Sequence, residues 1–226
     1  MQHAALWEPE IEYLAGREVP KVSPRRAHGV VQANVVQIVQ RCARELGGTV
    51  ATEWRFAINA DGDPRTSLVP DVAFLSNERL AALDEEAREE PPFAPDVAIE
   101  VRSPSDRIAD VEWKMAAYLA HGALLALDVI PADRVVRAFT REGMRVFSEG
   151  ERFASDAAPW LQFNARDAFC NILEDQHDST SHYPHRLRSV CTRSICRSDR
   201  RIGAHLEVLR HYHARFDHEH QSAQPT

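Results

Sequence analysis

The residues of this sequence best suited to catalysis are two acidic residues, each inside an apolar, strand-like segment, and a lysine downstream of them. Asp71 lies in the segment 68–75. Glu100 lies in the segment 94–102. A carboxylate buried among such residues needs a cation, a hydrogen-bond donor or a proton, because burial without a partner is costly. With Lys114 as a basic group, these carboxylates predict a site for a hard divalent metal ion.

The two segments can place their acidic side chains on one face of a sheet. Residues i and i+4 of a strand point to the same face, so Asp96 and Glu100 share one. Asp71 joins them if its strand is the neighbour in a suitable register. Magnesium keeps several waters and takes one or two carboxylates, so Asp71, Glu100 and the carbonyl of Val101 could bind it. Turn or capping duty after a proline is the alternative for Asp71 and Asp96.

The lysine falls on a predicted helix. Asp110, Lys114 and Tyr118 recur at intervals of four residues and so share one helix face. From that face Lys114 can point toward the strand carboxylates, where a cation would hold an attacking water or stabilise charge on a phosphate. The alternative is a surface ion pair between Asp110 and Lys114.

The elements that must position these residues alternate between helices and strands. Hydrophobic spacing and turn residues predict helices over 27–46 and 107–121 and strands over 49–58, 67–75, 95–102, 123–130, 135–140 and 144–148. This order predicts an α/β (α+β) domain with a mixed central β-sheet, covering residues 1–172.

The composition excludes some classes of protein. The chain has 226 residues, 44% of them hydrophobic, and no apolar run approaches the ~20 residues that span a bilayer. The start lacks the layout of a signal peptide, and the four cysteines are unpatterned, so a cytoplasmic protein with reduced thiols is expected. The net charge of −7 argues against broad non-specific affinity for nucleic acid.

Residues 173–226 differ in character from the rest of the chain. They hold eight of the 11 histidines and are rich in arginine, and they lack sustained apolar patterns. They are expected to form a basic, poorly ordered tail that could contact phosphates. A zinc site is a weaker alternative, although the spacing departs from that of a zinc finger; its ligands would be Cys191, Cys196, His205 and His211.

Several motifs lie along the chain from about residue 20 to residue 172. They are Ser23-Pro24, His28, Pro70-Asp71, Asp96-Val-Ala-Ile-Glu100-Val-Arg102-Ser-Pro-Ser105, Asp110-x3-Lys114-x3-Tyr118-x3-Gly122, Leu127-Asp128 and the segment 160–169. Together they resemble the Uma2 family of restriction-endonuclease-like proteins, within the PD-(D/E)XK nuclease superfamily. The resemblance implies a restriction endonuclease-like fold, with a mixed central sheet flanked by helices.

The resemblance also implies roles for individual residues. Asp71 and Glu100 would bind Mg²⁺ or Mn²⁺. Arg102 occupies the position of the superfamily's lysine, and Lys114 on the helix would replace that lysine in space. Supporting roles fall to Asp96, Arg102 and Tyr118. The segment 10–20 departs from the family's usual N-terminal glutamate, glycine turn and strand, so the start of the domain is expected to be truncated or divergent.

These features predict a magnesium-dependent endonuclease that hydrolyses phosphodiester bonds of DNA. Binding of DNA by so acidic a body calls for a homodimer, a local basic patch or a partner, and no membrane is involved. The alternative is a catalytically inactive nucleic-acid-binding or interaction module on a nuclease-like fold, favoured by the missing strand lysine. RNA is a further candidate substrate, because the fold contacts the phosphate backbone in either case.

Overall fold

A mixed sheet of six strands, in the order β3-β4-β5-β6-β7-β8, is the centre of the domain. The computed structural model describes residues 11–14, 17–20, 25–58 and 67–172. β5 and β6 are parallel, and the other neighbours are antiparallel. The strands are β3 (Gly48–Ala51), β4 (Val72–Ser76), β5 (Val97–Val101), β6 (Leu125–Ile130), β7 (Val135–Thr140) and β8 (Gly143–Ser148).

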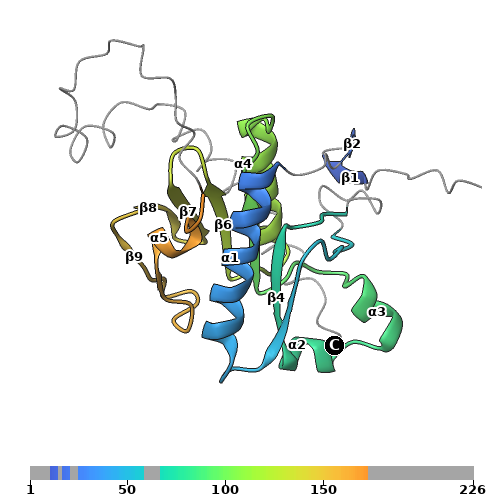
Figure 1. Ribbon diagram of the computed structural model, residues 1–226. Coiled ribbons are helices and arrows are strands. Elements are labelled where there is room, and N and C mark those ends of the chain that lie inside the picture. The colour runs from blue at the N-terminus through green and yellow to red at the C-terminus, as the bar shows by residue number, and fades with distance from the viewer. Residues whose placement is uncertain (1–10, 15–16, 21–24, 59–66, 173–226) are drawn as a thin grey trace, which may run out of the picture. The chain divides into compact units, whose positions relative to one another are not determined.

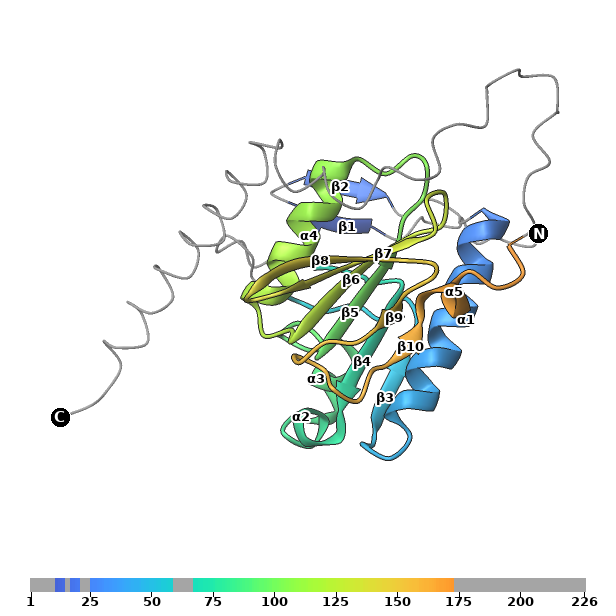
Figure 2. The ribbon, with the colours of Figure 1, turned by 90° about the vertical axis from the view of Figure 1, so that its left-hand side faces the viewer.

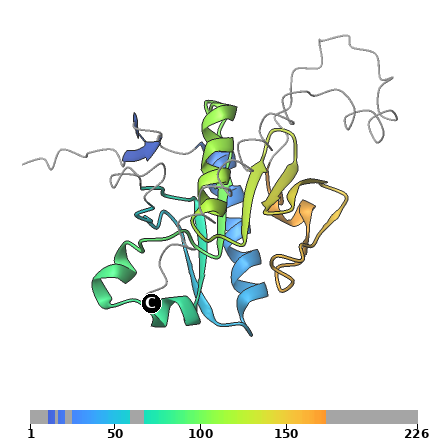
Figure 3. The ribbon, with the colours of Figure 1, turned by 180° about the vertical axis from the view of Figure 1, so that it is seen from behind.

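Two long helices cover opposite faces of this sheet (Figures 1 and 2). α1 (Arg26–Ala43) precedes β3, and α4 (Ile108–Ala120) links the parallel strands β5 and β6. Seen from behind, α4 lies in front of the sheet and α1 lies beyond it (Figure 3). The shorter elements are α2 (Asn77–Ala81), α3 (Glu85–Glu89), β9 (Arg152–Phe153), β10 (Phe163–Asn164) and α5 (Ala165–Ala168).

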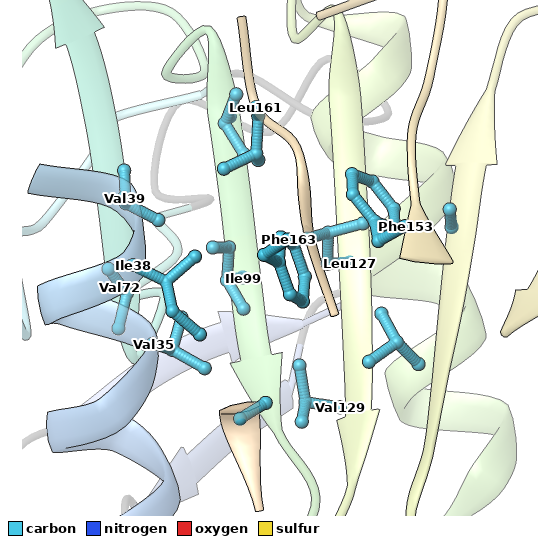
Figure 4. Close-up of a cluster of buried hydrophobic side chains, with 14 of the residues drawn as sticks. Val35, Ile38, Val39, Val72, Ile99, Leu127, Val129, Phe153, Leu161 and Phe163 are labelled. Atoms are coloured by element: carbon cyan, nitrogen blue, oxygen red, sulfur yellow. The ribbon is translucent and has the colours of Figure 1, made fainter. Parts of the chain in front are cut away.

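The pleat of β5 decides which residues meet each helix. Its residues alternate between the two faces, as successive strand residues must. Val97, Ile99 and Val101 belong to the core beneath α1, whereas Ala98 belongs to the core beneath α4. Glu100 therefore faces α4. Figure 4 shows the α1 side, where Val35, Ile38 and Val39 of the helix pack toward Ile99 and its neighbours.

A hairpin precedes the main sheet. β1 (Ile11–Leu14) and β2 (Arg17–Pro20) form an antiparallel pair in which Glu12 lies opposite Val19. The segment predicted to be truncated or divergent thus contains a strand with Glu12 at a buried position and a second strand paired with it.

The predicted mixed sheet flanked by helices is confirmed, although two strands are shorter than expected. The strand predicted over 49–58 ends at Ala51, because Glu53 has a positive φ of 52° that turns the chain. The strand predicted over 67–75 begins only at Val72. Pro70 lacks an N–H group for a strand ladder, which explains the late start.

The chain divides at Ile172 into two units, of which the second lies outside the described residues. The predicted tail over 173–226, its phosphate contacts and its zinc alternative all fall there. Within the described residues, none of the helices is long and apolar enough to cross a membrane.

We expect Gly48→Ala to lower the free energy of unfolding by about 2 kcal/mol or more. Gly48 has a φ of +151°, and a Cβ there would lie 2.6 Å from both the carbonyl oxygen of Leu75 and the ring of Phe74. Urea unfolding would measure the change. Gly150→Ala is the matched control, since a Cβ there meets nothing within 4 Å. Equal stability of the two variants would contradict the expectation.

Candidate active site

Asp71 and Glu100 meet at the end of β5 that leads into α4. Asp71 immediately precedes β4, and its Oδ2 accepts a hydrogen bond of 2.6 Å from the backbone N–H of Val101. The antiparallel pairing of Val72 with Ile99 fixes this register. Both carboxylates are buried, with 3% of Asp71 and 7% of Glu100 exposed. The structure thus brings together the two residues predicted to hold a metal.

Lys114 reaches the same place from α4. Its Nζ lies 3.3 Å from Oε2 of Glu100 and 2.6 Å from Oε2 of Glu12. The alternative of a surface pair between Lys114 and Asp110 is wrong, because Asp110 instead pairs with Arg17 at 2.7 Å. The lysine therefore lies between two buried carboxylates, as its place on the helix predicts.

The electrostatic field around Lys114 keeps its ammonium protonated. Burial lowers the pKa of Lys114, but the neighbouring carboxylates outweigh burial and raise that pKa above its ordinary value. The carboxylates responsible are Glu100, Glu12 and Asp71. A lysine in this state cannot accept a proton near neutral pH, so it can act only as a cation and a hydrogen-bond donor.

Tyr118 fixes the second oxygen of Glu100. Its hydroxyl donates a hydrogen bond of 2.7 Å to Oε1 of Glu100, one helical turn beyond Lys114. Burial and the charge of Glu100 raise the pKa of Tyr118 well above its ordinary value, so the hydroxyl stays a donor. The two partners on α4 together determine the orientation of the Glu100 carboxylate.

Glu12 belongs to this cluster, and the sequence patterns missed it. It is 3% exposed, and besides Lys114 it accepts a hydrogen bond of 2.9 Å from the backbone N–H of Val69. The available signal was its spacing, since Glu12 and Leu14 alternate with partly exposed residues and both are buried. An acidic residue at the inward-facing position of a short strand is thus the sequence signal for this buried carboxylate.

The first turns of α1 hold Asp71 from the other side. Nε2 of His28 lies 3.2 Å from Oδ2 of Asp71. Gln32, one turn later, donates to the backbone carbonyl of Asp71 at 2.9 Å and to Oε1 of Glu53 at 2.8 Å. The sequence patterns gave His28 no role, and they did not point to Gln32. Each predicted metal ligand is thus fixed by a different helix.

Asp96 and Arg102 are not part of this cluster. Asp96 lies at the opposite end of β5, where it accepts hydrogen bonds from the N–H of Ser76 at 2.7 Å and from Arg79 at 2.9 Å. Arg102 turns away from Glu100 and forms an ion pair with Asp128 on β6. Their contacts therefore stabilise the sheet and the loops around it.

The oxygen donors fit the divalent metal that the resemblance implies. Within the described ranges, no three histidine, cysteine or acidic side chains are arranged to hold a metal by themselves. Magnesium needs only one or two carboxylates with waters, so Asp71 and Glu100 supply enough hard ligands. The negative field that raises the pKa of Lys114 also attracts a divalent cation.

We expect Lys114→Met to lower the free energy of unfolding by about 3–5 kcal/mol near neutral pH, because buried carboxylates lose their cation. In the wild type, the raised pKa keeps the contribution of Lys114 complete below about pH 10.4, and it is lost only as the pH rises through the folded value.

Urea unfolding at several pH values would measure both effects. Arg145→Met is the control, because Arg145 is an exposed cation outside the cluster. We expect its stability to change by less than about 0.5 kcal/mol. Parallel pH dependence in the wild type and in Lys114→Met would contradict the role given to Lys114.

Comparisons with known proteins agree with this geometry. The family model Uma2, described as "Putative restriction endonuclease", matches residues 4–166, which include the β1–β2 hairpin. No curated protein matches the chain. A solved structure from Anabaena variabilis ATCC 29413, "a putative nuclease belonging to DUF820", is similar in fold, with a TM-score of 0.62 and 22% identity over 71% of this chain and 90% of that one. The match over most of its length shows that the chain belongs to the Uma2 family.

Proposed function

We propose that this protein is a metal-dependent endonuclease that hydrolyses phosphodiester bonds of DNA. The observation that carries the proposal is the convergence of Asp71, Glu100 and Lys114 in one buried cluster. Asp71 is the residue before β4, Glu100 belongs to the neighbouring strand β5, and Lys114 belongs to α4, which follows β5. Membership of the Uma2 family supports the same reaction class.

Asp71 and Glu100 would hold Mg²⁺ or Mn²⁺. Such an ion, when bound, lowers the pKa of an attacking water and polarises the phosphodiester. The protein's own part is to present both carboxylates in fixed orientations. The backbone N–H of Val101 holds Asp71, and the hydroxyl of Tyr118 holds Glu100.

Lys114 would stabilise the charge that develops on the phosphate. Its raised pKa excludes the role of general base, and a fixed cation in a buried site is effective because little water screens it. Glu12 holds the ammonium at 2.6 Å and is itself held by the backbone of Val69. Glu12 is therefore a positioning residue for Lys114.

We expect the wild type to nick plasmid DNA with Mg²⁺, and Glu100→Gln to lose at least about 10²–10³-fold of the rate. Gel analysis of supercoiled DNA would measure both. Asp96→Asn is the matched control, because it removes a buried carboxylate at the opposite end of β5 from Glu100. At temperatures below its melting temperature, it should cleave at the wild-type rate. Equal rates for wild type and Glu100→Gln, or no cleavage by either, would refute the catalytic assignment.

Lys114→Arg should retain more activity than Lys114→Met, because the proposed role needs a cation and not a proton acceptor. We expect Lys114→Met to reduce kcat by about 10²–10³-fold. Single-turnover cleavage at saturating protein would separate this effect from DNA binding. If Lys114→Arg and Lys114→Met both fold and lose the same factor in kcat, the positive charge is not what Lys114 contributes to cleavage.

A noncatalytic nucleic-acid-binding module is the second candidate. The observation that favours it is that Lys114 and Tyr118 already occupy both oxygens of Glu100. Metal-independent binding of DNA without cleavage would support this reading. A homodimer, a cytoplasmic location and the preference for DNA over RNA stay predictions.

A further inference from the structure

A second charged cluster lies beside the candidate active site, on the same face of the sheet. Glu100 on β5 is in register with Asp128 on β6, and Asp128 is in register with Arg137 on β7. Neighbouring strands are about 4.8 Å apart, so this cluster begins one strand away from Glu100. Arg102 follows Glu100 by two residues and shares its face.

One buried carboxylate holds both arginines. Asp128 is 0% exposed and accepts hydrogen bonds from Nε and Nη2 of Arg102 and, at 2.7 Å, from Nε of Arg137. A single negative charge between two guanidiniums leaves this triad net positive. Glu112, which contacts Arg137 at 3.3 Å, brings the formal charge of the four groups to zero, but its side chain is 27% exposed and water therefore screens its charge.

Arg102 keeps donors for a further acceptor. Its contacts to Asp128 use Nε and Nη2, while Nη1 makes no hydrogen bond to any part of the chain that the structure describes. The side chain is 15% exposed. Nη2 of Arg137 is buried and lacks a hydrogen-bond partner within the same described residues. Arg137 thus supplies charge behind Arg102, and Arg102 supplies the accessible donors.

We propose that Arg102, fixed by Asp128 and backed by Arg137, binds a backbone phosphate of the nucleic acid next to the phosphodiester cleaved at Glu100. This inference rests on the nuclease function proposed above. A guanidinium held in one orientation suits phosphate oxygens, because its planar array of donors matches their geometry. A phosphate bound there positions the strand and carries no sequence information.

Arg102→Gln tests the site, since Asp128 keeps Arg137 as a partner. Fluorescence anisotropy with a labelled DNA duplex in EDTA, over a range of salt concentrations, measures binding without cleavage. We expect Kd to rise about tenfold and the slope of log K against log salt to fall by about one. In cleavage assays with Mg²⁺, KM should rise while kcat stays within about twofold.

Arg102→Lys keeps the charge but loses the planar fork, so it should preserve the salt slope and only part of the affinity. It also serves as the test if Arg102→Gln does not fold, in which case unchanged affinity of Arg102→Lys overturns the site. Arg145→Gln is the matched control, because Arg145 stacks over Phe147, whose side chain belongs to the core on the α1 side. It should alter neither the Kd nor the slope.

The outcomes separate the two proposals. If the wild type cleaves DNA but folded Arg102→Gln keeps its Kd and salt slope, the phosphate site is overturned and the nuclease function stands. A fall in the kcat of Arg102→Gln with no rise in its KM or Kd would also overturn the phosphate site and leave the nuclease function standing. If binding depends on Arg102 as expected but the wild type does not cleave, the nuclease function is overturned and the phosphate site is supported. A wild type that does not bind DNA overturns the phosphate site.

Discussion

The burial of Lys114 among the carboxylates of Glu100, Glu12 and Asp71 is the interaction on which the rest of the domain depends. Each carboxylate would be costly in this position without a cation or a donor. The ammonium would be equally costly without the carboxylates, because burial alone lowers its pKa. The contacts of this cluster join α4, β5 and the N-terminal hairpin. The candidate active site is therefore also a part of the tertiary structure.

This dependence explains the arrangement of the elements around the sheet. The parallel connection from β5 through α4 to β6 returns Lys114 and Tyr118 to the face on which Glu100 lies. The opposite face of β5 is apolar and packs beneath α1. The start of α1 nevertheless contacts the site, because Asp71 lies at the sheet end where His28 can reach it. Both helices thus combine a packing role with the orientation of one carboxylate.

Sequence patterns predicted the parts of this site that are defined locally. Glu100 stands out in an apolar strand, and Lys114 is placed by helical spacing from its neighbours, so neither required knowledge of distant contacts. Glu12 was missed because its burial depends on a hairpin docking against α4, far along the chain. Asp96 was grouped with Glu100 because both can share a strand face. A step of four residues along a strand is, however, longer than a side chain, so the two carboxylates do not meet. Its partners, Ser76 and Arg79, belong to the other end of the sheet.

The choice between Arg102 and Lys114 as the cation at Glu100 follows from their competing partners. Arg102 is on the correct face and close in sequence, but Asp128 is completely buried in the adjacent register position and requires a charged donor. Arginine satisfies that requirement through two of its nitrogens, which draws the guanidinium toward β6. The space at Glu100 is then open to a lysine from α4, whose compact ammonium can contact Glu12 and Glu100 together. The buried Asp128 thus accounts for the separation of the two cations, with one at the carboxylates and one at the neighbouring strand.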